Sequence, residues 1–458
     1  MEYRIESDSI GSKQVPADAY YGVQSLRGME NFQITGQRLR PEFIESLAEI
    51  KKACAISNHN VGDLNDNIYQ AICQVCDEIM AGQLHDQFIC DPIQGGAGTT
   101  ANMNANEVIA NRAIEILGGT KGDYSIVHPN DHVNRSQSTN DVIPTAAKLT
   151  ALKLLNKAIP EVQRLHDALV AKSEEFHDII KMGRTQMQDA VPIRLGAEFG
   201  AYAKAINRDL DRIKRAMNEL YIITLGGTAV GTAINANVDY VNGLAPILSE
   251  ITGLPLVKAD DLVDGTQNLD SFAYVSAALK TCAISCSKIA NDLRLMSSGP
   301  RCGFEEINLP PMQNGSSIMP GKVNPVIPEV MSQASFCIVG NDMCITMAAE
   351  AGQLELNYAE PVLYHKLFES IVALTGAAQT FTDNCITGIT ANEERCRELV
   401  EGSVGVITAI CPVVGYTESA DIAKTAIKTG QSVREVLKSK KLFTDEKVDE
   451  ILDPSTMV

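Results

Sequence analysis

The chain has 458 residues, of which 45% are hydrophobic and 21% are charged, and its formal net charge is −18. This composition excludes disordered, collagen-like and low-complexity proteins, and the negative charge disfavours nucleic acid or an anionic membrane as a partner. The first residues are charged and no apolar run approaches the roughly 18 residues of a membrane helix, so we expect a cytoplasmic protein.

Long helices are the main elements that the sequence predicts. Apolar residues recur at steps of three and four, which is the spacing of one buried helix face. In chain order, the stretches with this spacing are 43–54, 68–80, 142–180 and 272–296. The first of them follows Pro41, a favourable residue for a first helical turn. Alternation typical of strands is scarce outside the first 35 residues and residues 226–235, so the predicted fold class is mostly α.

Loops rich in Gly and Pro separate the predicted helices. We predict three domains: a mostly helical N-terminal domain of residues 1–139, a central long-helix bundle of residues 140–390, and a small helical C-terminal domain of residues 391–458. In the last domain, Thr444 has the features of a helix N-cap and is followed by an acidic first turn.

Cysteine and histidine show no pattern of a disulfide scaffold or a metal site. The one Cys-x-x-Cys pair, Cys73 and Cys76, lies in a predicted helix with no second pair downstream. Buried helix positions are therefore favoured over a redox or zinc role, and no metal ligand set is predicted.

Four segments combine glycine with small polar residues that a helical core does not need. They are Gln94–Thr100 with its continuation to Glu107, His128–Asp141, Gly183–Asp189 and Gly315–Pro325. Ser, Thr and Asn are also common N-caps and turn formers. Four such segments together indicate a site whose hydroxyl, amide and backbone donors bind carboxylate oxygens.

The segment Gly315–Pro325 has the composition of a lid that closes over a substrate. Its two glycines allow motion, whereas its two prolines limit it. Lys322 supplies a positive charge for a carboxylate, and Ser316 or Ser317 is the candidate nucleophile or base. Because no His lies nearby in the sequence, acyl transfer by a nucleophilic Ser is the weaker interpretation.

The lid sequence resembles the element Gly-Ser-Ser-x-Met-Pro-x-Lys-x-Asn-Pro of the aspartase and class II fumarase superfamily at every fixed position. The resemblance extends along the chain from Asp18–Gln24 to Gly388–Asn392. Within the superfamily, Gln137–Asp141 resembles aspartases in having Thr where fumarases typically carry a second Ser, and Asn324–Glu329 continues as in aspartases.

The resemblance implies a mostly α, three-domain lyase whose central long-helix bundle forms a multi-helix core in a homotetramer. The implied reaction is the reversible deamination of L-aspartate, a small dicarboxylate, to fumarate and ammonia by anti-elimination through an aci-carboxylate intermediate. A class II fumarate hydratase is the alternative, and a non-catalytic structural protein related to lyase-fold crystallins is the least favoured. No cofactor is implied; some aspartases are activated by Mg²⁺, but no ligand cluster in this sequence predicts it.

The same resemblance assigns roles to individual residues. Ser316 would be the base that takes the Cβ proton; because serine is a weak acid, a closed lid, backbone donors and positive charge must favour its alkoxide. The residues for the β-carboxylate are Ser138, Thr139 and Ser317, those for the α-carboxylate are Thr185, Lys322 and Asn324, and those for the amino group are Thr99 and Asn140. Gln186 joins them as a substrate-binding residue, at a position where fumarases and some aspartases have His.

Several positions depart from the aspartase pattern. His128–Asp131 resembles the stretch that forms a second anion site in fumarases, which keeps the hydratase alternative open. Gly227 replaces a usual Ala, Tyr358 and Ala359 replace a usual Val-Met pair, and Cys411 replaces a usual Asn. These changes leave the range of accepted substrates undetermined.

The spacing of the polar segments predicts a site shared between chains. Ser138 precedes and Thr185 follows a periodic stretch of about 38 residues. If this stretch is one helix, a rise of about 1.5 Å per residue sets its ends roughly 55 Å apart, too far to contact one small substrate. Antiparallel helices of neighbouring chains would bring such ends together, and the resemblance adds that each site draws on three chains of a tetramer. The alternative is a break near Pro160 that folds the chain back on itself.

Overall fold

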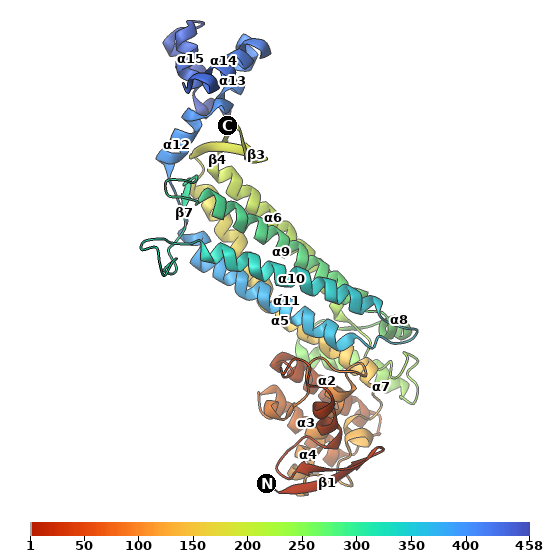
Figure 1. The fold of residues 1–458 in the computed structure, drawn as a ribbon. Helices are drawn as coiled ribbons and strands as arrows, with labels where there is room; N and C mark the ends of the chain where they lie inside the picture. The colour runs from red at the N-terminus through yellow and green to blue at the C-terminus, as the bar shows by residue number, and fades with distance from the viewer. Residues whose placement is uncertain (1) are drawn as a thin grey trace. The chain divides into compact units, whose positions relative to one another are not determined.

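Helices make up most of the computed structural model, which describes residues 2–458 (Figure 1). The chain falls into two units. The first contains the chain up to Ile159, Asp211–Thr281 and Cys337–Leu374, and the second contains Pro160–Leu210, Cys282–Phe336 and Thr375–Val458. Each unit combines three separate stretches of the chain, whereas each predicted domain is one continuous stretch. The two divisions are therefore not comparable, and the predicted domain boundaries after residues 139 and 390 stay predictions.

The α-helices are α1 (Val23–Asn31), α2 (Pro41–Asn60), α3 (Asp66–Met80), α4 (Thr99–Ile116), α5 (Thr139–Glu175), α6 (Leu195–Met217), α7 (Val238–Thr252), α8 (Leu262–Gln267), α9 (Asp270–Met296), α10 (Val326–Glu350), α11 (Glu360–Asn384), α12 (Glu393–Gly402), α13 (Ile407–Val414), α14 (Tyr416–Thr429), α15 (Val433–Lys440) and α16 (Asp445–Ile451). The antiparallel strand pairs are β1 (Tyr3–Asp8) with β2 (Gly11–Pro16), β3 (Ile180–Thr185) with β4 (Gln188–Arg194), and β7 (Ile307–Asn308) with β8 (Thr390–Ala391). The short strands β5 (Ile222–Ile223) and β6 (Val257–Lys258) pair in parallel.

The helices predicted from apolar spacing are confirmed, and with them the mostly α fold class. Helix α2 begins at Pro41, and α9 buries its seam from Phe272 to Met296. Helix α5 continues through Pro160 for 37 residues, so the predicted alternative of a break at this proline is wrong. Buried neighbours on both sides of the proline, Ala158 and Val162, show why: packing of the apolar face outweighs the loss of one backbone hydrogen bond.

The first unit is built around α2, which contacts α3, α4 and α7. Aromatic pairs join the helices of this unit: the rings of Phe43 and Phe368 lie 6.0 Å apart, and those of Phe272 and Tyr364 lie 4.8 Å apart. On α3, Cys76 is buried and Cys73 half-buried, and burial raises the pKa of both thiols. The predicted helix positions of this Cys-x-x-Cys pair are therefore confirmed.

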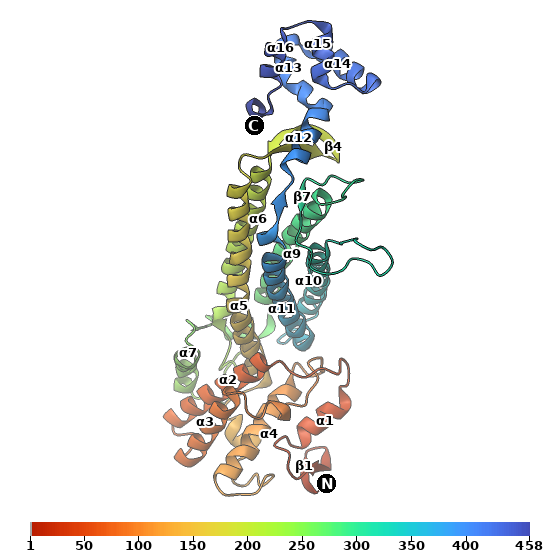
Figure 2. The same ribbon diagram turned by 90° about the vertical axis from the view of Figure 1, so that its left-hand side faces the viewer.

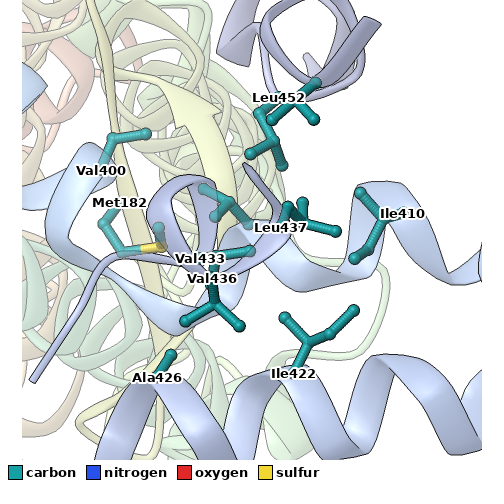
Figure 3. Packing of buried hydrophobic residues seen from close by; sticks show 11 residues of the cluster. Met182, Val400, Ile410, Ile422, Ala426, Val433, Val436, Leu437 and Leu452 are labelled. Carbon is teal, nitrogen blue, oxygen red and sulfur yellow. The ribbon is translucent and has the colours of Figure 1, made fainter. Parts of the chain in front are cut away.

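The second unit has a separate apolar cluster near the C-terminus of the chain (Figure 3). Met182 of β3 packs there against side chains of α12 to α16, among them Val400, Ile422 and Leu437. Thr444 caps α16, because its side chain accepts a hydrogen bond from the backbone N–H of Lys447, as predicted.

The Gly-rich segment 226–235, where the sequence also shows some strand-like alternation, is a loop. The segment forms turns, because Gly226, Thr228, Gly231, Ala233 and Asn235 all have positive φ, which an extended strand does not allow. In residues 2–458, no helix combines the length and the apolar character that crossing a membrane requires.

Candidate active site

The loop before α4 positions Thr99 at the first turn of that helix. Gly98 has φ of 88°, and a Cβ added there would lie 2.9 Å from Cγ2 of Ile143. Glycine therefore allows this loop to pack directly against the first turns of α5. The N-cap residue Gly98 has no side chain, and backbone N–H groups in the first turn of α4 are bonded within the protein: that of Thr99 donates to the carbonyl of Gly96 at 3.0 Å, and that of Ala101 donates to Gln94 Oε1 at 2.9 Å. Thr99 is exposed, and its hydroxyl donates to the carbonyl of Gly96 at 2.8 Å.

The loop before α5 places Ser138, Thr139 and Asn140 beside one another. The Ser138 Oγ accepts a hydrogen bond from the backbone N–H of Asn140 at 3.2 Å, and the Asn140 amide donates to the carbonyl of Ala229 at 2.7 Å. The Thr139 Oγ1 accepts from Asn102 Nδ2 at 3.4 Å. All three residues are half-buried, so their polar groups are accessible at one end of the helix.

Asp141, in the first turn of α5, anchors this loop. Its fully buried carboxylate accepts the backbone N–H groups of Ser138 at 2.9 Å, Gly226 at 2.9 Å and Thr228 at 3.2 Å. Burial raises the pKa of Asp141 to about 6, so the carboxylate is charged at neutral pH and holds the two loops together.

A buried lysine lies behind the same loop and was missed from the sequence. Lys51 of α2 is 0% exposed, and its Nζ donates to the amide oxygens of Asn102 at 2.8 Å, Asn134 at 2.9 Å and Gln137 at 2.8 Å. Its position four residues after Leu47 on an apolar helix face was the available signal, because charged residues are rarely fully buried without a partner.

Thr185 and Gln186 lie at the exposed tip of the β3–β4 hairpin in the second unit. The two-residue loop consists of Gln186 with φ of 53° and Met187 with φ of 65°. Two positive φ values are typical of the type I′ turn, which usually contains Asn or Gly. The strained backbone holds two side chains in a fixed place at the surface, a feature found at ligand sites.

A largely buried ion pair fixes strand β3 one residue before this tip. Arg184 donates to Glu306 Oε1 at 2.8 Å and lies over the ring of Phe304, with its guanidinium carbon 4.1 Å from the ring centroid. Glu306 is fully buried and also lies 3.4 Å from Lys181. Arg184 therefore positions the hairpin and is itself occupied by protein partners.

The predicted lid is the loop between β7 and α10, which extends from the helices of the second unit (Figure 2). Two hydrogen bonds join the ends of its Gly315–Pro325 segment. The Gly315 N–H donates to the carbonyl of Lys322 at 2.9 Å, and the Asn324 amide donates to the carbonyl of Gly315 at 2.7 Å. A Cβ at position 315 would lie 2.3 Å from the Lys322 oxygen, so only glycine fits this closure.

Inside the lid, Ser316 Oγ accepts two backbone hydrogen bonds. The donors are the N–H groups of Met319 at 3.0 Å and Ile318 at 3.2 Å. Ser317 and Lys322 are exposed on the same loop. The two N–H donors favour negative charge on the Ser316 oxygen.

Each unit thus gathers part of the predicted site. The first unit brings together Thr99, Ser138, Thr139 and Asn140, and the second carries Thr185 and Gln186 on its hairpin and Ser316, Ser317, Lys322 and Asn324 on its lid. The individual roles of these residues stay predictions. Residues 2–458 contain no group of three or more His, Cys, Asp or Glu placed to hold a metal ion.

Two family comparisons match the chain. The family described as "Lyase" matches residues 11–340, and the family described as "Fumarase C C-terminus" matches residues 406–458. The chain is 55% identical to an aspartate ammonia-lyase from Bacillus subtilis, over 100% of this chain and 96% of the relative. It is 45% identical to an aspartate ammonia-lyase from Escherichia coli, over 99% and 96%.

Solved structures with the same fold include a fumarate lyase:delta crystallin and a fumarase. A fumarate lyase:delta crystallin from Brucella melitensis bound to cobalt has a TM-score of 0.96 and 48% identity, and the match covers 100% of this chain and 99% of that one. A class II fumarase from Schistosoma mansoni also has a TM-score of 0.96, with 35% identity over 100% and 99%. The fold is therefore shared with a class II fumarase, but the sequence identity to this fumarase, 35%, is lower than the 45% and 55% identity to the two ammonia-lyases.

Proposed function

The chain belongs to the aspartase and class II fumarase superfamily and is a carbon–nitrogen lyase that deaminates L-aspartate to fumarate and ammonia, and we propose that Ser316 is the base that starts this reaction. The observation that carries the choice of base is the pair of backbone N–H groups on Ser316 Oγ. They stabilise the serine oxygen when it is negatively charged, and the exposed ammonium of Lys322 on the same loop adds positive potential.

The proposed reaction has two steps. Ser316 takes the proton from Cβ of L-aspartate, and the electron pair of the broken C–H bond moves into the β-carboxylate, which becomes an aci-carboxylate dianion. The pair then returns to form the Cα–Cβ double bond as the Cα–N bond breaks, which releases ammonia and leaves fumarate. Because the charge grows on the β-carboxylate, hydroxyl and amide donors that face it lower the barrier.

Substrate contacts are proposed from the same arrangement. Ser138, Thr139 and Ser317 donate to the β-carboxylate, and Thr185, Lys322 and Asn324 hold the α-carboxylate. Thr99 and Asn140 contact the amino group, and Gln186 completes the pocket without offering a titratable group. The positions of these residues support the assignment. Their side chains are accessible and lie at helix N-termini, at a hairpin tip and on a lid, where loops commonly offer hydrogen-bond donors to anions.

We further propose that each site is completed by other copies of the chain in a homotetramer. Helix α5 alone is 37 residues long, and at about 1.5 Å per residue its two ends lie roughly 55 Å apart. Helix α10 supplies a surface for the second copy. Its exposed face carries Val330, Phe336, Met343 and Met347, and in this fully described helix no Asp, Glu, Lys or Arg is exposed between Val330 and Met347.

The fumarase alternative has one feature in its favour. His128 accepts the backbone N–H groups of Asn130 and Asp131 at 3.2 and 3.1 Å and lines a cavity of about 480 Å³ with Arg27. Arg27 itself is paired with Asp8 at 2.8 Å, which reduces the positive potential available there to a second dicarboxylate. This stretch therefore does not outweigh the identity to ammonia-lyases.

Substrate choice is tested by parallel assays of the purified protein. We expect deamination of L-aspartate to exceed dehydration of L-malate by orders of magnitude, because the Thr139 and Val326–Glu329 features are those of aspartases. Both reactions form fumarate, so its ultraviolet absorbance reports each rate on one scale. Equal or faster turnover of malate would make the hydratase assignment correct, and no turnover of either would support a structural protein.

Other expectations stay predictions. We propose that the enzyme needs no cofactor and works in the cytoplasm. Gly227, Tyr358, Ala359 and Cys411 depart from the aspartase pattern, and assays with relatives of aspartate test whether these departures widen the range of substrates. Only the first has a clear steric consequence: a Cβ at position 227 would lie 3.1 Å from the carbonyl of Thr224, so an alanine there requires a small shift.

A further inference from the structure

We propose that Lys51, buried in α2, is a positioning residue that directs the hydroxyl proton of Thr139 toward the substrate carboxylate. The inference rests on the proposed function, in which Thr139 binds the β-carboxylate. Lys51 acts through one intermediate side chain, Asn102, and does not itself touch the substrate.

The first step is the set of partners around the lysine nitrogen. An ammonium group has three N–H donors and no acceptor. The three donors of Lys51 are satisfied by three neutral amide oxygens, on Asn102, Asn134 and Gln137, at 2.8 to 2.9 Å. The structure records no ion pair for Lys51 within residues 2–458. A fully buried cation without a paired carboxylate is costly for stability, so stability alone does not account for its presence.

The second step is the direction in which the amides must point. Because Lys51 only donates, Asn102 has to face it with Oδ1, and its Nδ2 is then turned the other way. That nitrogen donates to Thr139 Oγ1 at 3.4 Å and to Asn134 Oδ1 at 3.2 Å. Since the Thr139 oxygen accepts from Asn102, its own O–H is left to donate elsewhere, toward an anion at the end of α5.

Without the ammonium, the Asn102 amide loses the contact that fixes its orientation. A flipped amide presents oxygen to Thr139, and the threonine hydroxyl then donates to Asn102 in place of the substrate. The same lysine also orients Gln137, whose Nε2 donates to the carbonyls of Val133 at 2.9 Å and Arg135 at 3.2 Å. One buried charge thus fixes both the donor beside Thr139 and the loop that leads into Ser138.

The proposal predicts how kcat/KM depends on pH. The titratable groups that face Lys51 are Cys54 on α2, Cys76 on α3 and Asp141 on α5. Burial lowers the pKa of Lys51 to about 8, whereas it raises that of Cys54 to about 12 and that of Asp141 to about 6; burial also raises the pKa of Cys76. Above pH 8 the lysine loses one N–H donor and its charge, so kcat/KM should fall there in the natural protein.

The test compares Lys51→Met with Lys52→Met. Lys52 is the neighbouring residue, forms a partly exposed ion pair with Asp77 at 2.6 Å and has no role in the site, so its variant is the matched control. We expect Lys51→Met to lower kcat/KM for L-aspartate by about 10²-fold, the size of a lost preorganised donor. We also expect it to lack the decline near pH 8, while Lys52→Met keeps both the rate and the decline.

A double-mutant cycle with Thr139→Val separates positioning from a general structural effect. If Lys51 acts through the Thr139 hydroxyl, Lys51→Met should add little further loss once that hydroxyl is gone. The proposal would be overturned if the double variant lost kcat/KM by the product of the two single losses. It would also be overturned if Lys51→Met had the same kcat/KM and pH profile as the Lys52→Met control. If Lys51→Met does not fold, Asn102→Ala enters the same cycle with the same expectation, because it removes the intermediate amide.

The outcome also separates this inference from the proposed function. An unaltered protein that does not deaminate L-aspartate contradicts the function itself. An active protein in which the Lys51 and Thr139 effects are independent contradicts only the positioning role.

Discussion

Replacing Ser316 with alanine is expected to abolish measurable deamination of L-aspartate. General-base catalysis contributes about 10² to 10⁴-fold, and no other side chain of the lid offers an oxygen held by two backbone N–H groups. The substitution removes one exposed-loop hydroxyl and no apolar packing, so the fold should be unchanged. Initial rates of fumarate formation, with circular dichroism and sedimentation of the same samples, measure both parts of the prediction.

Ser439→Ala provides the control for this substitution. Ser439 is exposed, and its hydroxyl bonds only the carbonyl of Val436 at 2.7 Å, far from any predicted site residue in the sequence. The control should keep the rate of the unaltered protein. A Ser316→Ala enzyme that retained most of its kcat, with the control also active, would show that another group removes the Cβ proton.

The second large effect is the recovery of activity in mixed tetramers. A Ser316→Ala variant and a Thr185→Val variant should each be nearly inactive. After the two are dissociated, mixed and reassembled, we expect activity to return, because a site drawing Ser316 from one chain and Thr185 from another can then contain both natural residues. Native mass spectrometry of the mixture confirms that hybrids have formed before the rate is measured.

A second mixture provides the matched control for shared sites. Ser316 and Lys322 belong to one short loop, whose ends are joined by the hydrogen bond from Gly315 to the Lys322 carbonyl. Any site therefore takes both residues from the same chain, and mixing Ser316→Ala with Lys322→Ala should restore nothing. Inactive Ser316–Thr185 hybrids of confirmed composition would contradict sites built from several chains.

Elements with a regular apolar repeat could be predicted from the sequence alone. Helix α9 is an example, because every three- or four-residue step from Phe272 to Met296 is buried. The cap at Thr444 could be predicted as well, because a capping hydroxyl acts on the backbone only three residues away. In both cases, the pattern that predicts the element lies within the helix itself or its immediate flanks.

The β3–β4 hairpin could not be predicted in the same way. Its turn residues, Gln186 and Met187, adopt positive φ, although neither is a common residue of such turns. The hairpin is held by contacts distant in the sequence, since Arg184 binds Glu306 and Met182 packs in the C-terminal cluster. The residues next to the hairpin in the sequence do not indicate which distant residues it contacts.

The candidate site likewise has residues that local sequence identifies and residues that only distant contacts identify. Ser316 and Thr139 lie in motifs of adjacent residues, so the sequence pointed to them directly. Lys51 contacts Asn102 and Gln137, which are 51 and 86 positions away in the sequence. A buried charge of this kind is defined by three-dimensional neighbours, and only the folded chain reveals it.

The reverse reaction in deuterated water gives the most direct test of the central claim, that this protein interconverts L-aspartate with fumarate and ammonia by proton transfer at Cβ: in this direction ammonia adds to one carbon of the double bond and a proton adds to the other. The purified protein is incubated with fumarate and ammonium ions in D₂O, and the product is identified by proton NMR. The account predicts L-aspartate with a single deuterium at Cβ, formed by the unaltered protein and not by Ser316→Ala. Malate as the main product, or aspartate formed equally well by Ser316→Ala, would contradict it.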